Sequence, residues 1–182
     1  MYYHFKESDL ISSATPIIIE GARGSGKTMI LKHLSFFCQT ELSGTSRMLP
    51  KISEDGYLGV YFRYSADYST LFESLNCSKN YRESLFDGYF QLCVGLELAR
   101  IIQSLECELD KIEIENLFNK ISNLIGTTIS NSKDIIKWIE KNIRLQDDII
   151  RKSQYLDIDE RHFFTQKKFL FDFIGKIHES TT

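Results

Sequence analysis

A glycine-rich loop close to the start of the chain constrains the fold more than any other feature. Residues 16–34 read PIIIEGARGSGKTMILKHL, in which three consecutive isoleucines form the apolar run expected of a strand buried on both faces. Apolar residues recur near helical spacing after Thr28. The segment between them matches G-x-x-x-x-G-K-[ST] at Gly21, Gly26, Lys27 and Thr28. This order of strand, glycine loop and helix predicts a phosphate-binding loop, and the alternative is a glycine-rich structural turn.

The glycines, the lysine and the threonine of the loop each have a chemical reason to be there. Glycines let the backbone curl so that successive N–H groups point at one anion, and the following helix adds the positive end of its dipole. We expect Lys27 to reach the β- and γ-phosphates and Thr28 to place its hydroxyl on Mg²⁺. Arg23 has no role in this general mechanism, and a solvated or structural side chain is its default interpretation. The predicted nucleotide-binding set is Gly21, Arg23, Gly24, Ser25, Gly26, Lys27 and Thr28, with Thr28 as the metal ligand.

Two segments carry a resemblance to a known family. The first reads IIIEGARGSGKTMILKHLSFF, and the second, which follows after a loop, reads GYLGVYFRY. Together they resemble the start of the AAA-type P-loop ATPases of the origin-recognition and signal-transducing (STAND) groups, in which a similar E-G-x-R-G-S-G-K-T loop opens the nucleotide module. The likeness covers about residues 10–65. It implies ATP with Mg²⁺ as the ligand.

The fold class predicted from these patterns is α/β. Ile17–Ile19 and Tyr57–Phe62 are the two expected strands, and residues 40–56 between helix and strand are expected to form a loop. The remaining chain is predicted to be helical, over about 82–107 and 109–125, from Ser132 onward and after Asp159. We therefore predict a P-loop, three-layer core with an incomplete parallel sheet in residues 1–65. A large helical region, residues 66–182, would be packed on or inserted into the same domain.

The acidic residues that hydrolysis requires are hard to find. A hydrolysing P-loop enzyme needs an aspartate at the end of a buried strand to hold Mg²⁺. The only candidate is QYLDIDE, which ends at Asp159 and Glu160, but Asp157 interrupts the apolar run. Capping of the last helix explains the same residues. Because two strands are too few for a covered parallel sheet, a truncated product or a fragment of a longer ATPase would account for the pattern.

Three functions remain open after this reading. The first is an AAA-type ATPase module whose missing acidic elements come from a longer chain or a neighbouring subunit. The second is a non-catalytic nucleotide-binding switch, in which the helices from Tyr81 onward bind a protein partner or a second copy of the chain. The third, a small P-loop kinase, is less favoured because such enzymes use several lid arginines and the arginines here are scattered. A GTPase would need D-x-x-G and then N-K-x-D. This function is excluded, because DFIG follows NSKD in the chain instead of preceding it.

Charge gives little support for nucleic acid as a partner. The formal net charge is -3 and the pI is about 5.8, so any such binding would need a local basic patch. One candidate stripe lies opposite an isoleucine face, but acidic residues flank it, and an ordinary solvated face is the preferred interpretation. The stripe consists of Lys133, Lys137, Lys141 and Arg144.

No membrane segment is expected. The most apolar stretch, residues 84–105, contains Asp87, Glu97 and Arg100, which would be costly in lipid. The first residues lack the basic and apolar regions of a signal peptide, so a cytoplasmic location is expected. The four cysteines lie far apart without a C-x-x-C pair, which argues against a zinc or disulfide framework.

Overall fold

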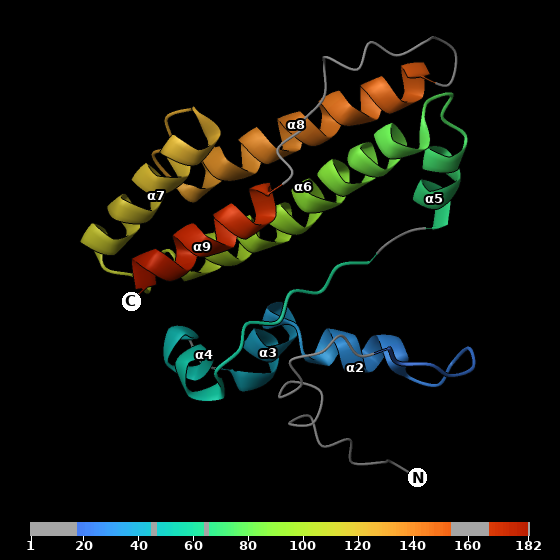
Figure 1. Cartoon of the computed structure of the whole chain (residues 1–182). Coiled ribbons are helices and arrows are strands. Elements are labelled where there is room, and N and C mark those ends of the chain that lie inside the picture. Colours follow the sequence, from blue (N-terminus) through green and yellow to red (C-terminus); the bar gives the residue numbers. More distant parts are fainter. Residues whose placement is uncertain (1–17, 45–46, 64–65, 154–167, 182) are drawn as a thin grey trace. The chain divides into compact units, whose positions relative to one another are not determined.

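The computed structural model describes residues 18–44, 47–63, 66–153 and 168–181 (Figure 1). The chain divides into two compact units, Met1–Tyr61 and Phe62–Thr182, each of which is described by itself. The first unit contains α2 (Lys27–His33), α3 (Phe36–Ser43) and α4 (Leu49–Asp55). The second contains α5 (Ala66–Glu73), α6 (Lys79–Leu105), α7 (Lys111–Ile125), α8 (Ser132–Ser153) and α9 (Phe169–Thr181).

The predicted α/β fold class is wrong. The described ranges contain helices and no strand, so the expected parallel sheet of a P-loop core is not formed there. Ile18 and Ile19 are irregular, with Ile18 83% exposed, and Tyr57–Phe62 is irregular as well; Ile17 lies outside the described residues. An apolar run of β-branched residues becomes a strand only when a neighbouring strand pairs with its backbone, and these two segments do not pair.

The predicted loop over residues 40–56 is also wrong, because most of it is helical. One continuous helix was expected after Thr28, but Ser35 has extended backbone angles and separates α2 from α3. Glycines in the left-handed region end the next two helices, Gly44 (φ 59°) after α3 and Gly56 (φ 72°) after α4. Pro50 lies in the first turn of α4, where its missing N–H costs no helical hydrogen bond.

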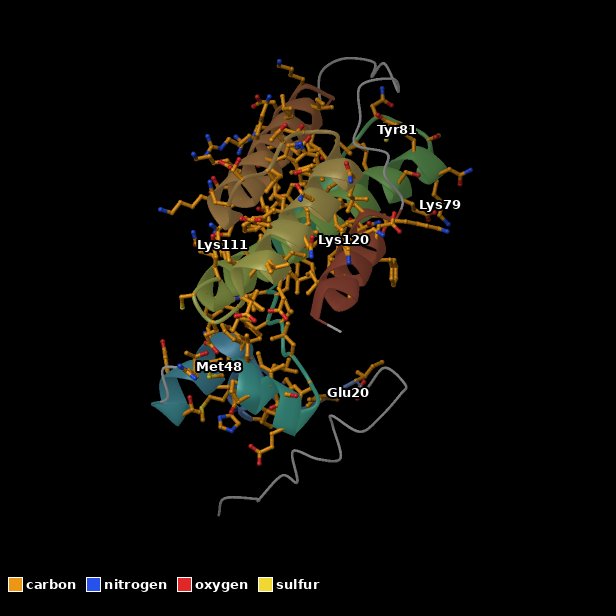
Figure 2. The ribbon with its side chains drawn as sticks, turned by 90° about the vertical axis from the view of Figure 1, so that its left-hand side faces the viewer. Glu20, Met48, Lys79, Tyr81, Lys111 and Lys120 are labelled. Atoms are coloured by element: carbon orange, nitrogen blue, oxygen red, sulfur yellow. The ribbon has the colours of Figure 1, made fainter. Side chains whose placement is uncertain are left out.

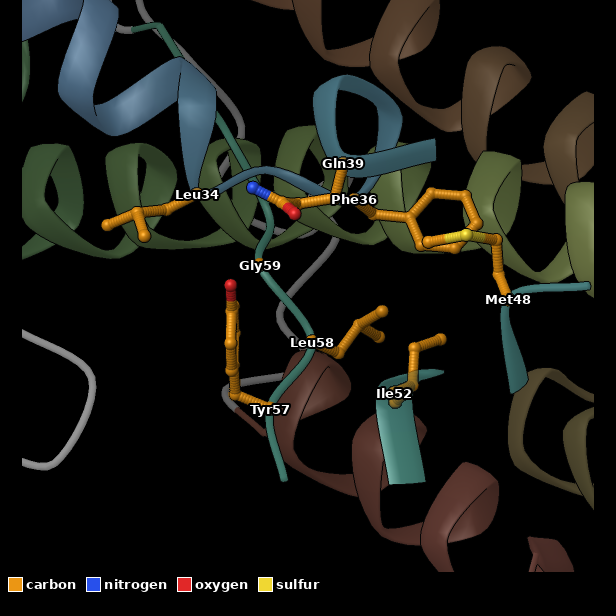
Figure 3. Close-up of a pocket in the computed structure, with 8 residues that line it drawn as sticks. All are labelled: Leu34, Phe36, Gln39, Met48, Ile52, Tyr57, Leu58 and Gly59. Carbon is orange, nitrogen blue, oxygen red and sulfur yellow. The ribbon is translucent and has the colours of Figure 1, made fainter. Parts of the chain in front are cut away.

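Gly59, in the irregular segment that follows α4, contacts the junction between α2 and α3. The Phe36 N–H donates to the Gly59 carbonyl at 2.8 Å, and an added Cβ at Gly59 would lie 1.8 Å from the Leu34 carbonyl oxygen. Phe36 and Met48, each 3% exposed, are the buried apolar residues in the described part of this unit. Eight residues line a cavity of about 20 Å³ around them, which suits one or two water molecules rather than a nucleotide base (Figure 3). They are Leu34, Phe36, Gln39, Met48, Ile52, Tyr57, Leu58 and Gly59.

The second unit is built around α6. This helix packs against α5, α8 and α9, while α7 packs against α9 (Figure 1). Apolar residues at helical spacing supply the core of the unit. The fully buried members include Leu92 of α6, Ile121 of α7, Ile135, Ile139 and Ile150 of α8, and Phe169 and Phe173 of α9. The helical reading of this half of the chain is therefore confirmed over the described residues.

Helix ends in the second unit follow local side-chain chemistry. Gly126, with φ 67°, ends α7. A helix was expected from Ser132 onward, and Ser132 is the first residue of α8. The cap bond comes from Asn131, whose side-chain oxygen accepts the Asp134 N–H at 3.2 Å. The hydroxyl of Ser132, 1% exposed, instead donates to a carboxylate oxygen of Glu106.

Two contacts attach α9 to α6. Gln91, 4% exposed, accepts the Leu170 N–H at 3.1 Å and donates to Asp87 at 2.8 Å. Gly95 lets Phe169 approach α6, because a Cβ at Gly95 would lie 3.0 Å from the Phe169 ring. None of the helices in the described ranges is long and apolar enough to cross a membrane.

Candidate functional site

The glycine loop forms a tight turn that leads into α2. The Ser25 N–H donates to the Ala22 carbonyl at 3.2 Å, and α2 begins directly after Gly26. Gly24 (φ 87°) and Gly26 (φ 85°) both lie in the left-handed region, where a side chain would be strained. A Cβ at Gly21 would lie 2.8 Å from Ser25 Oγ, which is the end of a side chain that can turn aside. The backbone angles of the loop thus favour glycine at positions 24 and 26.

Lys27 folds back over the turn. Its Nζ donates to the carbonyl oxygens of Gly21 and Ala22, the latter at 2.9 Å, and to Ser25 Oγ at 3.1 Å. Carbonyl and hydroxyl oxygens are neutral, and no carboxylate in the described part of the chain forms an ion pair with Lys27. Glu20, which precedes the loop, is exposed (Figure 2). The loop therefore holds a positive charge that no described acid neutralises.

Backbone donors of the loop are also available. Within the described residues, the N–H groups of Gly24, Gly26 and Thr28 meet no acceptor. Gly24 and Thr28 are exposed and Gly26 is partly exposed. Such N–H groups on alternate residues of the turn and the first turn of α2, next to an ammonium group, form an environment that suits an oxyanion.

The structure brings together only part of the predicted set. Gly21, Ser25 and Lys27 are in direct contact, whereas the exposed side chains of Arg23 and Thr28 make no hydrogen bond or ion pair in the described regions. The weak catalytic candidates, Asp159 and Glu160, lie outside the described residues. Ala22, which the motif leaves unspecified, accepts both the Ser25 N–H and the Lys27 ammonium. Sequence reasoning missed it because it acts only through its carbonyl.

The basic stripe on α8 lies on a solvated face. Lys133, Lys137 and Lys141 are exposed, and Arg144 forms an ion pair with Glu140 at 3.6 Å. Both partners of that pair are accessible to water, so the pair contributes little to stability. The buried residues of α8 lie on its other side, and Trp138 contacts the Phe169 ring, with centroids 5.7 Å apart. Trp138, which is partly buried, therefore lies at the margin of the core.

A polar cluster interrupts the apolar contact between α6 and α8. Tyr89 of α6 hydrogen-bonds to Tyr68, Cys93 and Asp147. Burial raises the pKa of the Tyr89 hydroxyl, and burial also raises the pKa of the Cys93 thiol to about 11. Burial raises the pKa of Asp147, although the Tyr89 hydrogen bond and the nearby Arg151 oppose the rise. Cys93 is therefore a poor nucleophile, and the cluster affects stability rather than chemistry.

Changing Asp147 to asparagine should stabilise the protein at neutral pH. Because the pKa of Asp147 is higher in the folded chain than the usual value of about 4, the wild type loses stability as pH rises from that value through the folded pKa. The variant lacks this titration, so its advantage should shrink toward acidic pH. Urea unfolding at a series of pH values, followed by Trp138 fluorescence, measures this. An advantage that stays constant from acidic to neutral pH would contradict the assignment.

Comparison with known proteins gives one match. The family model described as ORC-CDC6-like matches residues 2–181, far more of the chain than the residues 10–65 that carry the motif resemblance. No curated protein and no solved structure matches the chain.

Proposed function

The chain belongs to the ORC-CDC6-like family, and we propose that its loop, Gly21–Thr28, binds the phosphates of ATP together with Mg²⁺. Family membership relates the chain to AAA-type ATPases. The single observation that carries the proposal is the ammonium of Lys27, which lies over the loop on neutral oxygens and without an acidic partner among the described residues. A phosphate would supply the missing negative charge.

The described residues support distinct roles within the loop. The N–H groups of Gly24 and Gly26 would donate to phosphate oxygens, and Lys27 would add a charge-assisted hydrogen bond. Thr28, exposed in the first turn of α2, has a hydroxyl that meets no partner among the described residues and would coordinate Mg²⁺ beside the phosphates. All of these groups belong to one short segment, Gly21–Thr28.

Binding of ATP by the loop does not require that the chain hydrolyses it. Asp159 and Glu160 are the acids that the sequence suggests for Mg²⁺, and a longer chain or a neighbouring subunit could supply such groups instead. A nucleotide-dependent interaction module is the second candidate. It is favoured by apolar side chains that α9 leaves accessible, with Phe171 75% and Ile174 45% exposed.

Replacing Lys27 with alanine should weaken MgATP binding by about tenfold or more, since a hydrogen bond to a charged phosphate contributes about 1.5–3 kcal/mol. Isothermal titration of both proteins with MgATP measures the change. Lys32→Ala is the matched control, because it removes the same charge from the same helix but contacts the Tyr61 ring, 5.7 Å from its centroid, instead of the loop. Equal losses in the two variants would show a general charge effect and would remove Lys27 from the site.

A further inference from the structure

Every hydrogen-bond donor of the Lys27 ammonium is already in use. An ammonium group has three N–H donors and no acceptor. In this loop they go to the carbonyls of Gly21 and Ala22 and to the hydroxyl of Ser25, at 2.9 Å for Ala22 and 3.1 Å for Ser25. A phosphate oxygen can therefore take a full hydrogen bond from Lys27 only if one of these acceptors is displaced.

The three acceptors differ in how easily they can be displaced. The carbonyls belong to the backbone of the turn, and the Ala22 carbonyl also accepts the Ser25 N–H at 3.2 Å, which fixes its direction. The Ser25 hydroxyl lies on an exposed side chain that turns about a single torsion. It lies over Gly21, where a Cβ would approach Ser25 Oγ to 2.8 Å. Ser25 is thus the acceptor that can leave at the lowest cost.

We infer that Ser25 is a positioning residue: its hydroxyl holds Lys27 over the loop in competition with phosphate, and bound phosphate replaces it. The inference rests on the proposed nucleotide site. Its consequence is that removing the hydroxyl strengthens MgATP binding, because one donor of Lys27 then faces water instead of a competing protein group. A single exposed hydrogen bond is worth little, so the gain should be about threefold.

Two measurements on the full chain test this. The ¹⁵N-attached protons of the Lys27 ammonium, observed by NMR without nucleotide, should exchange faster with water in Ser25→Ala than in the wild type. Titration with MgATP should show about threefold tighter binding by the same variant. Ser25→Thr, which keeps a hydroxyl, should show the exchange rate and the MgATP affinity of the wild type. Ser104→Ala, an exposed serine of α6 in the other unit, should change neither.

The outcomes separate this inference from the proposed function. If the wild type binds MgATP and Ser25→Ala binds equally or more weakly, the competition is refuted while the nucleotide site stands. An unchanged rate of ammonium proton exchange in Ser25→Ala would likewise show that the Ser25 hydroxyl does not hold Lys27 over the loop. If the wild type does not bind MgATP, the proposed function fails and this inference fails with it.

Discussion

Replacing Gly59 with alanine should destabilise the unit Met1–Tyr61 by about 3 kcal/mol or more, the upper range for overpacking. The added Cβ would lie 1.8 Å from the Leu34 carbonyl oxygen and 3.2 Å from the Ser35 Cα, both of which are backbone atoms that cannot turn aside. Moving the segment away would also break the hydrogen bond from the Phe36 N–H. Urea unfolding followed by backbone amide NMR reports on this unit specifically.

Gly44→Ala is the matched control for this change. Gly44 also lies in the first unit, with φ 59°, but apart from its chain neighbours no heavy atom of the described residues lies within 4 Å of an added Cβ, so only left-handed strain of about 1–2 kcal/mol is expected. A loss at Gly59 no larger than the loss at Gly44 would show that the close approach to Leu34 does not hold this unit together.

Replacing Phe169 with alanine should cost about 3–5 kcal/mol, the usual range for removing a buried phenylalanine. Phe169 is 1% exposed, stacks on Phe173 with ring centroids 5.6 Å apart, and packs against Gly95 of α6. Its ring also lies 5.7 Å from that of Trp138, the only tryptophan of the chain, so Trp138 fluorescence reports directly on the loss in a urea titration.

Phe171→Ala removes the same side chain two residues along the same helix. Because Phe171 is 75% exposed, the expected change in the free energy of unfolding is within about 0.5 kcal/mol. Similar losses in both variants would contradict the described orientation of α9.

Helices were predictable from the sequence because their signals are local. The expected helix over 109–125 corresponds to α7, Lys111–Ile125, and the one over 82–107 corresponds to α6, Lys79–Leu105. The periodic apolar residues and the glycine at position 126 are sufficient for this. The second half of α3 and the whole of α4 were predicted as loop, because helices of seven or eight residues show too little periodicity and the composition of residues 40–56 is polar.

Strands were harder to predict than helices, because the pairing of a strand depends on segments that are distant in the sequence. Ile18 and Ile19 have the composition of a buried strand, yet in the structure they have no partner strand among the described residues. The loop was easier to predict, since the motif specifies glycine at position 26, where φ is 85°, although it leaves Gly24, with φ 87°, unspecified. Spacing alone did not indicate that Lys27 would bond to the Ala22 carbonyl, because any residue type supplies a carbonyl.

The central claim is that Gly21–Thr28 binds ATP phosphates, and a backbone amide NMR titration with MgATP tests it most directly. The amides of Gly24, Gly26 and Thr28, which meet no acceptor in the described parts of the chain, should shift on binding and reach saturation together. The same shifts should require about tenfold more MgATP, or be lost, in Lys27→Ala. Saturable shifts confined to residues outside the loop, or no shifts at all, would contradict the account.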